Sequence, residues 1–149
     1  MNVIDYITEE VERQGHDTTV LDGIQRVGWM LNAWSMALYT HRLPTVIDAV
    51  HLGQMIEQVK NNDGIRSCGV RVGGRVCPPP SDVPRLLDRL FQMRDSMTPL
   101  EFYRQFELIH PFVDGNGRTG KVLLNWLGGT LLHPVFPPSD LFGEPIRNP

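Results

Sequence analysis

Length, composition and charge restrict this chain to a few classes of protein. Its 149 residues are 41% hydrophobic, which suits one globular domain, residues 1–149, with a buried core. The net charge of -3 gives no general attraction to nucleic acid or membranes, and no apolar run approaches the roughly 18 residues that span a bilayer. The first residues also lack the order of a signal peptide, so we expect a cytoplasmic protein.

The first half of the chain predicts two helices. Apolar residues recur with helical spacing over residues 21–40, which predicts one long amphipathic helix. A second helix is predicted to begin at Pro44, because proline is favoured in the first helical turn. It is expected to end near Lys60, before the turn sequence of residues 61–64.

A β-hairpin is predicted after these helices. A Gly-Gly pair at residues 73–74 favours a two-residue turn that puts Val72 opposite Arg75. This register separates Cys68 from Cys77 by about 7 to 8 Å, which is long for a disulfide. We therefore expect both cysteines to be free thiols, as in a reducing compartment.

The second half of the chain predicts three more helices. They are expected at residues 84–94, at residues 98–109 and at residues 116–132, of which the last is apolar on nearly all sides and therefore central. The proline-rich residues 133–149 are predicted to form an irregular tail. Two polar residues within the helices are expected to be buried and hydrogen-bonded, namely His51 and Asn125.

The run from His110 to Lys121 holds an unusual density of chemically active residues. It joins two predicted helices, and a loop that opens a helix presents unpaired N–H groups to an anion, commonly phosphate. Gly115 and Gly117 allow the backbone to approach a ligand closely. Asn116 can donate an amide N–H to the ligand or serve only as a helix cap.

Other side chains of this run suit the chemistry of phosphate transfer. Asp114 is a hard oxygen ligand of the kind that holds Mg²⁺ beside phosphates, or else a simple turn residue. Arg118 offers a planar fork for phosphate oxygens, and Lys121 is either a second phosphate ligand or a solvated helix charge. His110 titrates near neutrality and is the candidate general base. The run predicts transfer of a phosphate-containing group from a nucleotide.

The same run resembles the signature of the Fic family, His-x-Phe-x-Asp/Glu-Gly-Asn-Gly-Arg-x-x-Arg. It matches every fixed position from His110 to Arg118, and Lys121 replaces the final arginine. Residues 64–80 resemble the usual lead-in, so the resemblance covers roughly residues 44–132. It implies an all-α (mainly helical) Fic fold with a short β-hairpin flap.

The resemblance implies a protein adenylyltransferase, which moves AMP from ATP to a Ser, Thr or Tyr hydroxyl of a target protein, with Mg²⁺ as cofactor. It makes His110 the base, Asp114 the Mg²⁺ ligand and Arg118 a contact of the outer phosphates, with Phe112 as a buried anchor of the loop. Gly115, Asn116 and Gly117 would bind the phosphates. The related Doc kinases carry lysine where this chain has Gly117, which favours adenylylation over phosphorylation.

The resemblance also indicates which residues bind the target protein and what could inhibit the domain. The flap residues Val70, Arg71 and Val72 are expected to hold the target segment in an extended form. Self-restrained members carry an inhibitory helix with Ser or Thr, three residues, Glu, and Gly or Asn. The nearest match, residues 8–12, is followed by Arg13, so we expect no such helix. The inhibitor is then a separate, antitoxin-like protein, or the domain is unrestrained.

Two alternatives to adenylylation stay open at the level of the sequence. One is a Fic-type transferase with another phosphate donor, giving UMP, phosphoryl or phosphocholine transfer, because a phosphate cradle does not recognise the base. The other is a peptide-binding module in which Lys121 has weakened catalysis, since lysine lacks the bidentate fork of arginine.

Overall fold

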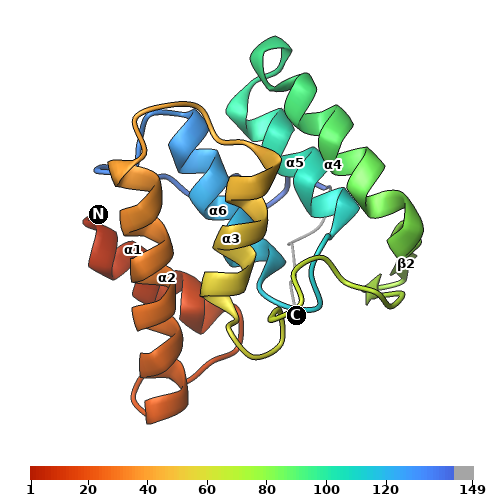
Figure 1. Cartoon of the computed structure of the whole chain (residues 1–149). Helices are drawn as coiled ribbons and strands as arrows, with labels where there is room; N and C mark the ends of the chain where they lie inside the picture. Colours follow the sequence, from red (N-terminus) through yellow and green to blue (C-terminus); the bar gives the residue numbers. More distant parts are fainter. Residues whose placement is uncertain (143–149) are drawn as a thin grey trace.

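The computed structural model describes residues 1–142, which form a helical protein with one small β-hairpin (Figure 1). The predicted all-α fold with a short flap is confirmed. Within these residues there are six α-helices, two short 3₁₀ helices and two paired strands. Their bounds are α1 Val3–Arg13, α2 Leu21–Tyr39, α3 Val46–Ile56, β1 Arg71–Val72, β2 Arg75–Val76, η1 Pro80–Asp82, α4 Val83–Gln92, η2 Arg94–Ser96, α5 Pro99–Ile109 and α6 Asn116–Leu127.

Helix α6 is the centre of the fold. Each of its residues from Asn116 to Trp126 is buried, and it packs against α5, α3 and α2 (Figure 1). The predicted central helix is therefore confirmed, although it ends at Leu127 and not at residue 132. The reason is the glycine pair that follows, because Gly129 adopts a left-handed φ of 68° that ends the helical path.

The ends of the other helices follow local capping. Helix α3 begins after Thr45, which forms a capping box with Asp48, so the predicted start at Pro44 was two residues early. It ends at Ile56 and not near Lys60. Helix α5 begins as predicted, with the Thr98 hydroxyl accepting a hydrogen bond at the helix start.

Helix α1 was not predicted. The Asn2 side chain caps it, and its buried face packs onto α2 and onto the chain after α6. There the ring of Phe136 stacks on Tyr6 at 4.0 Å, and the Tyr6 hydroxyl donates to the Val135 carbonyl at 2.8 Å. Residues 133–142 contain no helix or strand, as expected for this part of the tail, and residues 143–149 lie outside the described residues.

The hairpin has the predicted register. Val72 pairs with Arg75 across a turn in which Gly73 has a φ of 58°, and Arg71 pairs with Val76. Both cysteines are free thiols, as expected. The flap lies below α4 in Figure 1, beside the end of α5 that leads into the loop before α6.

The two polar residues expected in the interior differ in outcome. Asn125 is fully buried, and its side chain bonds to the Lys121 carbonyl and to both backbone groups of Val135. His51 is exposed on α3, so its predicted burial was wrong. Within residues 1–142, no helix combines the length and apolar character needed to cross a membrane.

Candidate active site

His110 stands at the junction of α5 and the loop before α6. It has a left-handed φ of 52°, an uncommon conformation for a residue other than glycine, and its N–H still bonds to the Phe106 carbonyl. The Arg66 side chain fixes this junction, because its Nε donates to the His110 carbonyl at 2.7 Å and its Nη2 donates to the Ile109 carbonyl at 3.2 Å. The backbone therefore holds the imidazole in one place.

The His110 imidazole is buried, and no side chain forms a hydrogen bond with it in residues 1–142. Its residue exposure is 1%, and neither ring nitrogen forms a hydrogen bond of ordinary geometry in residues 1–142, although the Glu107 backbone carbonyl is close enough to interact with the ring. Burial lowers the pKa of His110 to about 4; the Glu107 backbone carbonyl opposes this shift, and the nearby Arg75 and Arg66 charges add to it. The ring is thus neutral at physiological pH and has a free lone pair, as a general base requires.

The loop after His110 is anchored at both ends of its turn. The Phe112 ring is fully buried against Gly53 of α3, where even a Cβ atom would lie 2.3 Å from the ring. The Asn116 side chain accepts from the Phe112 N–H at 2.8 Å and donates to the Phe112 carbonyl at 2.9 Å. Phe112 is the buried anchor that the sequence implies, and the Asn116 amide shapes the loop.

The start of α6 leaves backbone donors without helical partners. Gly115 precedes the helix with a φ of 73°, and the first helical bond runs from the Thr119 N–H to the Gly115 carbonyl. No side chain caps this end, so the N–H groups of Asn116, Gly117 and Arg118 have no partner within the helix. Such a helix start attracts anions through its N–H groups and its dipole.

Asp114 lies at the same helix start, and hydrogen-bond donors surround its carboxylate. Its carboxylate is 2.7 Å from the Lys60 ammonium, accepts from the Gly115 N–H at 2.7 Å and is 3.5 Å from Arg118. Burial raises the pKa of this carboxyl, but the Lys60 and Gly115 hydrogen bonds and the Arg118 charge outweigh it, so the pKa lies below its ordinary value. Asn61 holds the backbone by donating to the Asp114 carbonyl at 2.8 Å.

Arg118 is completely buried and belongs to an ionic network. Its Nη1 donates to Glu57 at 2.9 Å, and Arg26 of α2 binds the same carboxylate at 2.7 Å. Its Nε has no hydrogen-bond partner in the described part of the chain. Arg118 therefore keeps one N–H donor unused while it holds Glu57.

Lys121 is neither a solvated charge nor free. It is 5% exposed, its ammonium is 2.9 Å from the Glu10 carboxylate of α1, and it donates to the Tyr103 hydroxyl at 3.3 Å. Helix α1 thus supplies the buried carboxylate that pairs with Lys121, and the expected lack of an inhibitory helix stays a prediction.

The structure brings most predicted site residues together around the start of α6. Asp114, Gly115, Asn116, Gly117 and Arg118 lie there, and His110 begins the loop that leads to it. Lys121 turns toward α1. The flap residues Val70, Arg71 and Val72 belong to the hairpin that Arg75 joins to the end of α5. Sequence reasoning missed several participants, because nothing in their local sequence marks them. They are Glu10, Arg26, Glu57, Lys60 and Asn61.

The residues at the loop suit Mg²⁺ only in company with a substrate. Among residues 1–142, no group of three or more His, Cys, Asp or Glu side chains could enclose a metal ion. Asp114 supplies one ionised carboxylate next to a helix start that attracts phosphate. Mg²⁺ is commonly bound by one or two carboxylates plus phosphate oxygens, so this donor fits the ion when a nucleotide provides the rest.

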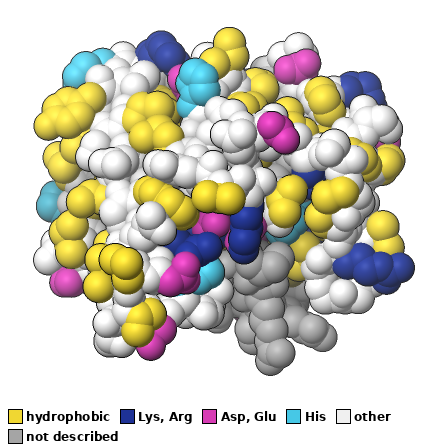
Figure 2. Space-filling view, turned by 60° about the horizontal axis from the view of Figure 1, so that its bottom comes forward, with side chains coloured by type: hydrophobic (Ala, Val, Ile, Leu, Met, Phe, Trp, Pro, Cys, Tyr) yellow, Lys and Arg dark blue, Asp and Glu magenta, His cyan; other side chains and the backbone are white. Residues whose placement is uncertain are grey.

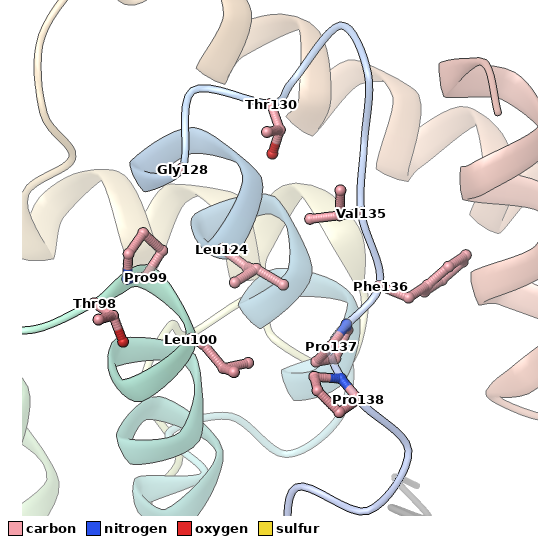
Figure 3. A pocket seen from close by; sticks show the side chains of 10 residues that line it. All are labelled: Thr98, Pro99, Leu100, Leu124, Gly128, Thr130, Val135, Phe136, Pro137 and Pro138. Atoms are coloured by element: carbon pink, nitrogen blue, oxygen red, sulfur yellow. The ribbon is translucent and has the colours of Figure 1, made fainter.

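A separate hollow lies at the other end of α6. This groove of about 290 Å³ is bounded by the start of α5, the end of α6 and the chain at residues 135–138 (Figure 3). Of its ten lining residues only Thr98 and Thr130 have polar side-chain atoms. It offers no acid, base or cation for phosphate chemistry, so we place the candidate active site at the loop.

Curated proteins that match part of this chain are named protein adenylyltransferases. The chain is 38% identical over 78 residues to the protein adenylyltransferase Fic of Drosophila persimilis, which covers 46% of this chain and 15% of that protein. It is 44% identical over 55 residues to a probable protein adenylyltransferase of Aquifex aeolicus, which covers 32% of this chain and 17% of that protein. The matched segment thus spans less than a fifth of either relative.

The fold and the family model extend the likeness beyond the short matches. A crystal structure of a Fic family protein from Desulfovibrio desulfuricans G20 superposes with a TM-score of 0.66 at 20% identity, covering 82% of this chain and 45% of that one. This likeness concerns the fold. The Fic/DOC family model matches residues 40–128, which include the flap, the loop and all of α6. With well over half of its residues matched, the chain belongs to the Fic/DOC family.

Proposed function

We propose that this chain transfers AMP from ATP to a Ser, Thr or Tyr hydroxyl of a target protein. The observation that carries the proposal is the neutral imidazole of His110, which stands six residues before a helix start that no side chain caps. A base and an anion site are the two parts that phosphate transfer to an alcohol needs. The name protein adenylyltransferase, borne by the relatives above, supports ATP as donor and AMP as the group transferred.

In the proposed reaction His110 takes the proton of the acceptor hydroxyl. The hydroxyl oxygen then bonds to the α-phosphorus of ATP, the bond from that phosphorus to the bridging oxygen breaks, and pyrophosphate leaves. Because burial keeps the imidazole neutral, its lone pair is available without prior loss of a proton at neutral pH. Arg66 keeps the base in position through the backbone carbonyl of His110.

The donor phosphates would lie at the start of α6. The backbone N–H groups of Asn116, Gly117 and Arg118 can donate to them, and the unpartnered Nε of Arg118 can add a charged donor. Asp114 would hold Mg²⁺, which supplies charge neutralisation to the phosphates when bound. Lys60, which now pairs with this carboxylate, is half exposed and can leave it for solvent.

Labelled donors test the reaction directly. ATP labelled at the α-phosphate, ATP labelled at the γ-phosphate and labelled UTP would each be incubated with the protein, Mg²⁺ and a cell lysate. We expect protein-bound label from the α-phosphate of ATP alone. Label from the γ-phosphate would instead identify a kinase, label from UTP a uridylyltransferase, and no label from any donor would contradict a nucleotide transferase.

A pair of histidine variants tests the assigned base. We expect His110→Ala to lower the transfer rate by about 100-fold or more, because general base catalysis contributes that much, while ATP binding is kept. The matched control is His51→Ala, which removes an exposed histidine on α3. Transfer that survives in His110→Ala, or an equal loss in both variants, would remove His110 from this role.

A further inference from the structure

The flap is the basic part of an acidic protein. The whole chain has 17 acidic and 14 basic residues, yet residues 64–81 contain three arginines and no Asp or Glu. Figure 2 shows Lys or Arg side chains grouped at the right-hand edge, on the side where Figure 1 places β2. A target segment that meets the flap therefore meets positive charge.

Two of the three arginines are already engaged in holding the flap. Arg66 is buried, and its guanidinium donates to the carbonyls of His110, Cys68 and Pro78. Arg75 is exposed but donates to the Leu108 carbonyl at 3.1 Å, at the end of α5. These contacts fix the flap beside the candidate base.

The third arginine, Arg71, is exposed and has no hydrogen bond or ion pair within residues 1–142. Its charge is consequently available to a ligand. A single available arginine suits a carboxylate on a peptide, whereas nucleic acid binding relies on several phosphate contacts.

The backbone of Arg71 faces the open edge of the hairpin. The Cys77 N–H bonds to the Val70 carbonyl at 3.1 Å, and Val72 pairs with Arg75 at the turn, so these residues direct their backbone groups toward the partner strand. In an antiparallel ladder the intervening residue, Arg71, directs its N–H and C=O outward. An extended peptide can form two main-chain bonds there, with the Arg71 side chain beside it.

We propose that the flap selects an acidic target segment, in which an Asp or Glu beside the acceptor hydroxyl pairs with Arg71 while the segment's backbone bonds to that residue's N–H and C=O. The inference rests on the proposed function for the fate of the hydroxyl, but the binding preference does not depend on transfer. Arg75 and Arg66 add positive potential and position the flap.

Peptide binding without ATP tests the preference. Three fluorescent peptides would share one extended sequence around a serine and differ only in flanking residues, which are acidic, amide or basic. We expect the acidic peptide to bind at least about fivefold more tightly than the amide peptide, which corresponds to one exposed charge pair, and to weaken with salt. The readout is fluorescence anisotropy of the full chain.

Four variants locate the preference. Arg71→Gln is expected to remove it, Arg71→Glu to reverse it toward the basic peptide, and Arg71→Lys to keep it. Arg89→Gln, which removes an exposed charge from α4, is the control for net charge and is expected to behave as the unchanged protein.

The outcomes separate this inference from the proposed function. Equal binding of the three peptides, no binding of any at millimolar concentration, a preference that survives in Arg71→Gln, or tighter binding of an oligonucleotide of equal charge would overturn the inference. An acidic preference in a protein that transfers no label would sustain the inference and reject the proposed function. Label transfer without any charge preference would sustain the proposed function and reject the inference.

Discussion

The ammonium group of Lys60 would compete with a divalent cation for the Asp114 carboxylate. It lies 2.7 Å from one carboxylate oxygen, and the other oxygen already accepts from the Gly115 N–H. Lys60 is half exposed, so its own pair with Asp114 contributes little to stability, of the order of 1 kcal/mol or less. A cation that binds Asp114 has to displace this ammonium.

We therefore predict that Lys60→Met raises the affinity of the ATP-bound protein for a divalent cation about two- to fivefold. The physical reason is the loss of a competing charge at Asp114. Titration with Mn²⁺ monitored by electron paramagnetic resonance, in the presence of a non-hydrolysable ATP analogue, measures this without any turnover. Lys60→Arg keeps the charge and is the control; weaker cation binding in Lys60→Met would mean that Lys60 supports the phosphates instead.

At the scale of elements, α1 and α6 are joined by a buried ion pair. Glu10 is completely buried and Lys121 is 5% exposed, and their charged groups are 2.9 Å apart. Removal of one partner from such a pair leaves an uncompensated buried charge, whereas an apolar replacement of both is often tolerated. The pair also directs the Lys121 ammonium toward α1.

We predict that Glu10→Leu and Lys121→Met each lower the free energy of unfolding by about 3 kcal/mol, and that the double variant regains most of that loss. Urea denaturation of the four proteins completes a double-mutant cycle. Additive losses would show that the two charges do not depend on each other. In the same series, tighter ATP binding by Glu10→Leu alone is expected if the freed Lys121 reaches the phosphates.

The same elements show which features a sequence can predict. The loop and its roles were predictable because His110 to Arg118 are contiguous and each residue type has a direct chemical meaning. Glu57 and Glu10 were not, because they contact α6 only through tertiary packing, 61 and 111 positions before their partners. Helix α1 was missed for a related reason: its buried face is narrow, and it gains its stability from packing on α2 and Phe136.

At the scale of the whole molecule, the buried His110 ties stability to pH. Its pKa of about 4 in the folded protein lies below the value of 6.5 that the unfolded chain shows, so the unfolded chain binds more protons between these values. The contribution of His110 to the free energy of unfolding is therefore fully present above about pH 6.5 and decreases as the pH falls toward 4. A shift of this size corresponds to about 3 kcal/mol. Asp114 and Asp48, whose pKa values are lowered, affect stability only at still lower pH.

We predict that the free energy of unfolding of the unchanged protein drops by about 3 kcal/mol between pH 7 and pH 4, and that His110→Asn removes most of this slope. The comparison concerns slopes, so an overall loss of stability in the variant does not affect it. His16, whose pKa burial also lowers, can add to the slope in the same range, and His16→Asn is therefore the matched control. Chemical denaturation at half-unit pH steps gives both curves. A slope that His110→Asn leaves intact, but His16→Asn removes, would show that the imidazole of His110 is accessible to protons in the folded state, and the neutral base on which the proposed reaction depends would lose its physical support.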